Sequence, residues 1–157
     1  MNLSVGISDW KVAKPPDMLV TYALGSCVGI CLYDKSKKIA GLSHIMLPDS
    51  KNGGDGLSVN RMKFADTAIP DMLKKMTSMG ASNLTAKIAG GALMFKIASD
   101  RFNIGERNII AVKTALQQLK IPIVAQDTGL DYGRTVFFNP ETGIMKVKST
   151  TKGEKDF

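Results

Sequence analysis

The chain has 157 residues, of which 44% are hydrophobic and 22% charged, a composition typical of one globular domain that can bury a core. Its apolar runs are too short to cross a membrane, and its first residues lack the features of a signal peptide, so we expect a cytoplasmic protein without direct membrane insertion. The formal net charge of +7 comes mostly from scattered lysines, and no basic run is interleaved with aromatic residues, so we expect no nucleic-acid partner.

The first part of the chain has the pattern of β-strands. Two short β-prone stretches, 3–7 and 10–13, precede KPPD (14–17), whose prolines interrupt the strand pattern. Three longer apolar stretches follow at 18–24, 27–34 and 39–47, with short polar or glycine-containing links between them. Consecutive strands with short links predict an antiparallel meander. Because these stretches are apolar on both faces, we expect a sheet that is covered on both sides.

A polar loop and a helix come next. Residues 48–60 are rich in Gly, Asn, Asp and Ser, and this loop is long enough to be a mobile flap or simply a disordered connector. Apolar residues then recur at helical spacing over 64–79, with Gly80 as the expected stop. Pro70 lies inside this pattern and predicts a kink or a later effective start of the helix.

The second half alternates between strand and helix patterns. It contains a strand that runs into a glycine turn, an amphipathic helix and three closing strands, the last two forming a hairpin: 83–92, 103–120, 121–129, 134–139 and 143–149. We expect the tail 149–157 to be loose. The sequence therefore predicts an α/β fold for residues 1–157, as a single domain with a mixed or antiparallel sheet and two main helices.

The two cysteines, Cys27 and Cys31, are expected to differ in role. A disulfide is disfavoured in a reducing compartment, and two cysteines with a single histidine cannot fill a four-ligand zinc site, so we expect no metal and no cofactor. Cys27 opens a strand beside the Gly25–Ser26 turn, where free backbone amides can stabilise a thiolate and an oxyanion. Cys31 lies inside the strand, where a small buried thiol is common.

A cysteine nucleophile needs a base, and His44 is the only histidine in the chain. A lone histidine among apolar residues is more often part of the core, so spacing alone does not establish the pair. A third group is needed to orient the imidazole, and Thr21, Ser43 and Asp49 are candidates among which spacing does not choose.

Two further motifs have structural interpretations. The stretch AGGALMF at 89–95 does not match a phosphate-binding loop and is read as a close-packing turn. The stretch NIGERN at 103–108 is read as a helix start, with capping by Asn103 and a salt bridge by Arg107; partner recognition is the alternative there.

Four stretches taken together resemble the chemoreceptor glutamine deamidase family, CheD. They occur in order along the chain, as TYALGSCVGICLYD (21–34), GLSHIMLPDS (41–50), KIAGGALMF (87–95) and NIGERN (103–108). One departure is visible, because the family tends to have paired glycines after DTG and here Gly129 is followed by Leu130. The resemblance implies a three-layer α/β sandwich, shared in outline with cytotoxic deamidase toxins.

The resemblance also implies a mechanism and partners. Cys27 would be the nucleophile, His44 its base and acid, and Thr21 the residue that orients the histidine. Receptor glutamines would be hydrolysed to glutamate through a thioester, with backbone amides near the Gly25–Ser26 turn holding the oxyanion, and a glutamate methyl ester could react in the same way. The implied partners are the cytoplasmic helices of chemoreceptors and the CheC phosphatase. The alternative is mainly a regulatory binding module for CheC.

Overall fold

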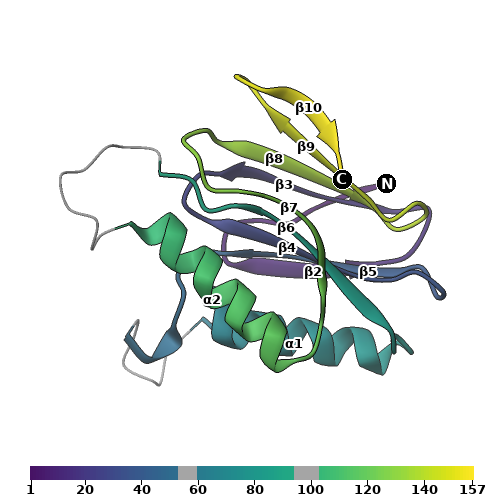
Figure 1. Cartoon of the computed structure of the whole chain (residues 1–157). Helices are drawn as coiled ribbons and strands as arrows, with labels where there is room; N and C mark the ends of the chain where they lie inside the picture. Colours follow the sequence, from purple (N-terminus) through teal and green to yellow (C-terminus); the bar gives the residue numbers. More distant parts are fainter. Residues whose placement is uncertain (53–59, 94–102) are drawn as a thin grey trace.

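The protein is described here from a computed structural model, which covers residues 1–52, 60–93 and 103–157 (Figure 1). Two five-stranded sheets and a layer of helices stack on one another. The outer sheet has the order β1 (Asn2–Ser4), β3 (Met18–Leu24), β8 (Arg134–Asn139), β9 (Ile144–Ser149) and β10 (Gly153–Asp156). The central sheet has the order β2 (Asp9–Ala13), β5 (Ile39–Ile45), β4 (Val28–Asp34), β6 (Leu84–Gly90) and β7 (Ile123–Thr128). Helices α1 (Ala65–Ser78) and α2 (Ile104–Gln118) cover the other face of the central sheet. The predicted α/β class is confirmed.

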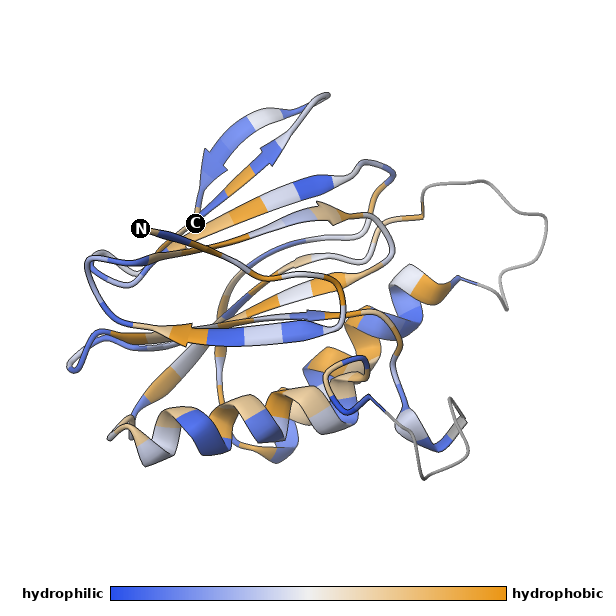
Figure 2. Cartoon of the chain, turned by 180° about the vertical axis from the view of Figure 1, so that it is seen from behind, coloured by the Kyte–Doolittle hydropathy of each residue, from blue (hydrophilic) through white to orange (hydrophobic). Residues whose placement is uncertain are grey.

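The central sheet lies between two apolar cores. Every residue of β4 and β5 is buried, which confirms the prediction of a sheet covered on both sides. Along β4, Val28 and Ile30 pack against the helices, whereas Cys31 and Tyr33 pack against the outer sheet. The alternation follows from the two-residue period of a strand. Figure 2 shows hydrophobic residues on strands of both sheets and on the helices, mixed with hydrophilic ones.

The predicted meander is wrong in one respect. Strands β4 and β5 pair in antiparallel fashion as expected, but β3 belongs to the outer sheet, where it pairs with β1 and β8. The turn at 25–27 therefore carries the chain from one sheet to the other. The reason lies in packing: β3 buries Leu19, Thr21 and Leu24 between the sheets, while Tyr22 and Ala23 remain exposed. A strand that is exposed at Tyr22 and Ala23 suits the outer sheet, whose other side faces solvent.

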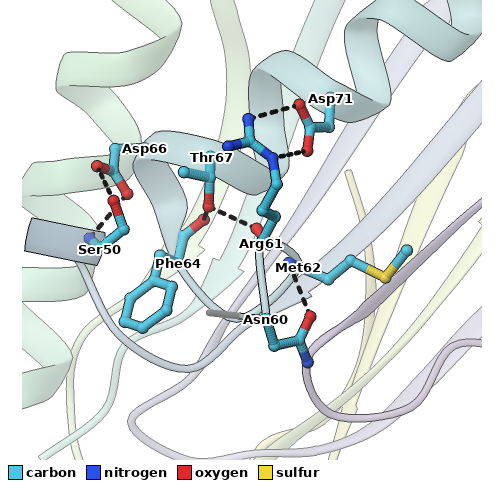
Figure 3. Close-up of polar contacts among 8 residues, drawn as sticks. All are labelled: Ser50, Asn60, Arg61, Met62, Phe64, Asp66, Thr67 and Asp71. Atoms are coloured by element: carbon cyan, nitrogen blue, oxygen red, sulfur yellow. Dashed lines mark hydrogen bonds and ion pairs between the residues drawn. The ribbon is translucent and has the colours of Figure 1, made fainter. Parts of the chain in front are cut away.

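Helix α1 begins at Ala65, keeps Pro70 inside it and is followed by Gly80 in the left-handed region. Its first turns hold both sides of the preceding loop (Figure 3). The backbone N–H and the hydroxyl of Ser50 donate to Asp66, at 3.0 and 2.9 Å, and Arg61 donates to both carboxylate oxygens of Asp71. Most of the segment for which we predicted a flap or connector, 48–60, lies outside the described residues.

The tail at 149–157 differs from our expectation of a loose segment. Residues Gly153–Asp156 form β10, which pairs antiparallel with β9. Two features hold it there. Opposite charges face each other across the pair, with Lys148 Nζ 3.3 Å from a Glu154 carboxylate oxygen, and Phe157 exchanges two backbone hydrogen bonds with Met145. Cross-strand pairing of this kind depends on the partner strand, which a local pattern in the tail does not reveal.

Candidate active site

The turn that carries Cys27 is held by all three of its carbonyl groups. The carbonyl oxygens of Gly25 and Cys27 accept hydrogen bonds from the backbone N–H groups of Ala92 and Gly91, at 2.9 and 2.8 Å. The carbonyl oxygen of Ser26 accepts a hydrogen bond from the side chain of Asn108 in α2, at 2.9 Å. Because the carbonyl and N–H of each trans peptide point in opposite directions, these bonds turn the N–H groups of the loop the other way.

Cys27 immediately precedes β4 and is partly exposed. Burial raises its pKa, and the Cys27 backbone N–H opposes this by favouring the thiolate. Cys31 is fully buried between the sheets, and burial raises its pKa well above the ordinary thiol value. The structure therefore separates the two cysteines as predicted: one reaches solvent beside a turn, and the other is part of the core.

His44 is buried in β5 and bonded to Thr21. The Thr21 Oγ1 atom lies 2.7 Å from His44 Nδ1 and also 2.7 Å from the carbonyl oxygen of Val5. A β-bulge in β3 after Thr21, with Ala23 at φ 59°, interrupts the ladder next to this contact. Of the three residues that spacing left open, Thr21 is the one that contacts the imidazole.

These contacts fix the tautomer of the imidazole. The Val5 carbonyl can only accept, so the single hydroxyl proton of Thr21 points to it, and Nδ1 of His44 must carry the other proton and donate to Thr21. The Nε2 atom is then left with a lone pair, and it is buried with no hydrogen-bond partner among the described residues. Burial also lowers the pKa of His44 to about 4, so the imidazole is neutral at pH 7. A neutral imidazole with a free Nε2 lone pair is the form that a general base requires.

Strand register relates Cys27 to His44. Gly29 lies directly opposite His44 in the β4–β5 ladder, and Cys27 precedes Gly29 by two residues on the same face. Diagonal neighbours of this kind have Cα atoms about 7–8 Å apart, within reach of a long side chain. No hydrogen bond joins the Cys27 sulfur to the imidazole in this structure. A Cβ at residue 29 would lie 3.1 Å from a methyl carbon of Leu24, so glycine keeps this strand position clear.

Two contributors were missed at the level of sequence. The Val5 carbonyl acts through its backbone, which no side-chain pattern reveals. Asn108 was read as part of a capping motif, yet it is fully buried and its side chain donates to the carbonyls of Ser26 and Met46. A polar residue on the apolar face of a predicted helix was the available signal. Asn103 does cap α2, accepting from the N–H of Glu106.

The described residues were also compared with the requirements of a metal site and of a membrane-spanning helix. Among the described residues, no group of three or more His, Cys, Asp or Glu side chains is arranged to hold a metal. In the same part of the chain, no helix is long and apolar enough to cross a membrane. Residues 94 and 95 of the glycine stretch 89–95 lie outside the described residues. Within the described portion, Gly90 to Ala92 pack against the Cys27 turn, as expected for a close-packing turn.

The chain is similar to known proteins over almost its whole length. Residues 46–149 match the family model described as CheD chemotactic sensory transduction. The chain is 50% identical, over 98% of its length and 96% of the relative, to the probable chemoreceptor glutamine deamidase CheD of Lachnoclostridium phytofermentans. It is 53% identical over the same shares to the probable enzyme of that name from Caldanaerobacter subterraneus. It is 49% identical, over 98% of its length and 97% of the relative, to the chemoreceptor glutamine deamidase CheD of Halalkalibacterium halodurans. This chain belongs to the CheD family.

Proposed function

We propose that this protein is a cytoplasmic chemoreceptor glutamine deamidase, with residues 1–157 acting as one domain and Cys27, His44 and Thr21 as its catalytic residues. Family membership and the names of its relatives support the reaction class. The observation that carries the residue assignment is the chain of contacts from Val5 through Thr21 to His44, which leaves Nε2 as a free base near a partly exposed thiol.

The first step forms the bond between sulfur and carbon. Both groups are neutral at rest, because the Cys27 pKa is raised and the His44 pKa is near 4. His44 Nε2 therefore takes the thiol proton as the sulfur attacks the side-chain carbonyl of a receptor glutamine. The resulting oxyanion is stabilised by backbone N–H groups of the turn, among them the Cys27 N–H, which favours the thiolate and so lowers the Cys27 pKa.

The second step breaks the carbon–nitrogen bond and releases the product. The protonated His44 gives its proton to the leaving nitrogen, ammonia departs, and a thioester to Cys27 remains. Water then attacks the thioester while His44 takes a proton from it; the carbon–sulfur bond breaks, and the thiol is restored with a glutamate on the receptor. A glutamate methyl ester would follow the same course with methanol as the leaving group.

Thr21 orients the base without supplying a charge. Its hydroxyl accepts from Nδ1–H, which holds the ring in the productive tautomer. A hydroxyl stabilises an imidazolium far less than a carboxylate does, so the charged histidine is short-lived, in keeping with its low pKa.

We further propose that the protein binds the CheC phosphatase, the partner that the CheD resemblance implies. The net charge of +7 supports binding to acidic protein surfaces in general. Calorimetric titration of purified CheC from the same organism into this protein tests the proposal. A saturable heat supports it, and no heat at micromolar concentrations contradicts it.

The deamidase proposal is tested by mass spectrometry of a receptor cytoplasmic fragment from the same organism, before and after incubation with the protein. Conversion of particular glutamines to glutamates, absent with Cys27→Ala, supports the proposal and maps the targets. If no glutamine changes although the receptor fragment and enzyme are both folded, the deamidase proposal fails and the regulatory CheC-binding module becomes the better account.

A further inference from the structure

Asn108 lies where two strands of the active site separate. The β4–β5 ladder ends at the pair Val28–Ile45. One step further, Cys27 and Met46 no longer pair, and the side chain of Asn108 takes the place of the missing ladder bonds. Its Nδ2 atom donates to the carbonyl of Ser26 at 2.9 Å and to the carbonyl of Met46 at 3.0 Å. One side chain from α2 thus joins the turn of the nucleophile to the end of the strand that carries His44.

The bond to Ser26 also sets the direction of the Cys27 backbone N–H. The Ser26 carbonyl and the Cys27 N–H belong to one planar trans peptide and point in opposite directions. Holding the oxygen on Asn108 therefore fixes the direction of the Cys27 N–H. The influence of this N–H on the Cys27 thiol pKa agrees with that orientation.

Packing alone does not account for an asparagine at this position. Asn108 is fully buried on the face of α2 that also buries Gly105, Val112 and Ala115. In the described part of the chain, its Oδ1 atom is buried and has no hydrogen-bond partner, which is costly in a protein interior. The two carbonyl acceptors fix which end of the amide is the nitrogen, because an oxygen there would face two other oxygens. An unpaired buried acceptor is thus tolerated to keep both donor bonds.

We propose that Asn108 is a positioning residue for the deamidation proposed above: it fixes the Ser26–Cys27 peptide so that the Cys27 N–H faces the oxyanion, and it holds the end of β5 against that turn. Asn108 does not touch the substrate. It acts through the backbone amide of Cys27 and through the placement of His44.

The test compares Asn108→Ala and Asn108→Ser with Val112→Ala, a fully buried residue one turn along the same helix that makes neither bond. The first readout needs no receptor: the rate at which iodoacetamide alkylates Cys27 is followed against pH, by peptide mass spectrometry. Cys31 is fully buried and marks any unfolding by reacting. The second readout is kcat and KM on a receptor fragment.

We expect Asn108→Ala to raise the pKa of the Cys27 thiol and to lower kcat by about tenfold or more, since loosening an oxyanion donor costs part of what removing it would. KM should change by less than about twofold, because the contacts with receptor are untouched. Asn108→Ser, which keeps one donor, should fall between, and Val112→Ala should match the wild type in both readouts.

Equal thiol pKa and equal kcat in Asn108→Ala and Val112→Ala would overturn the proposal. If Asn108→Ala does not fold, the same comparison between Asn108→Ser and Val112→Ala decides it. If the wild type deamidates no receptor, the proposed function fails, while the alkylation profile still decides whether Asn108 sets the environment of Cys27.

Discussion

The burial of His44 predicts a pH-dependent loss of stability that a single substitution removes. In the folded protein the His44 pKa is about 4, whereas an exposed histidine in the unfolded chain titrates near 6.5. Between these values the unfolded chain binds a proton that the folded protein does not. The free energy of unfolding must therefore decrease as pH falls through this window, and the contribution of His44 stops changing below the folded pKa.

The size of the effect follows from the two pKa values. Between pH 7 and pH 5, protonation of His44 in the unfolded chain lowers the free energy of unfolding by about 2 kcal/mol. From pH 7 to pH 4 the decrease approaches about 3 kcal/mol. Carboxylates also titrate toward the acid end, so the effect of His44 must be isolated by a variant. His44 is the only histidine in the chain, and His44→Gln keeps a polar side chain of similar size without a group that titrates in this range.

The assay is urea unfolding at pH 7, 6 and 5 for the wild type and His44→Gln. We expect the wild type to lose about 2 kcal/mol more than the variant between pH 7 and pH 5. Parallel pH dependences in the two proteins would mean that His44 titrates in the folded state as it does in the unfolded chain. The inference of a buried neutral imidazole would then be refuted.

Three further predictions concern Thr21, Asp34 and Leu130. Thr21→Val should lower kcat by about tenfold or more, because the imidazole loses the hydrogen bond that orients it. In the same variant, ¹⁵N NMR of the single histidine should no longer show only the Nδ1–H tautomer. An unchanged spectrum with full activity would contradict the role of Thr21 in orienting His44. Asp34 accepts from backbone amides of two loops and its pKa is held well below the usual range, so Asp34→Ala should destabilise the protein by about 2 kcal/mol in urea, and a loss below measurement error would contradict that role. Leu130 is 65% exposed and has φ 62°, so Leu130→Gly should leave stability equal or raise it by up to about 1 kcal/mol in thermal unfolding; a clear decrease would show that the leucine side chain is needed.

Local pattern predicted the elements well and their pairing less well. Strands β4 and β5, helix α2 and the β8–β9 hairpin all lie where hydrophobic periodicity and turn residues indicated. The place of β3 in the outer sheet was missed. An apolar strand next to β4 in sequence can either pair with β4 in one sheet or pack face to face with it from a second sheet, and the local pattern is the same in both cases. The tail was expected to be loose for a similar reason. Its order depends on pairing with β9, and the sequence of the tail alone does not reveal that partner.

The candidate site could be predicted in part. The choice of Cys27 over Cys31 followed from its place at the strand start beside the glycine turn, whereas Cys31 lies inside the strand. Spacing could not select Thr21 as the partner of His44, because that contact joins two different sheets across the β3 bulge. Asn108 was overlooked since helix-start motifs usually serve capping, and its two acceptors are backbone carbonyls far away in the sequence.

The most direct measurement of the central claim is the rate of ammonia release from a receptor fragment by the wild type, Cys27→Ala and Cys31→Ala, side by side. Both substitutions remove one thiol from the same face of one strand, but only Cys27 reaches solvent beside the turn. The account predicts no release above background for Cys27→Ala and activity near that of the wild type for Cys31→Ala. Full activity in Cys27→Ala, or its loss in a folded Cys31→Ala, would contradict the assignment of Cys27 as the nucleophile.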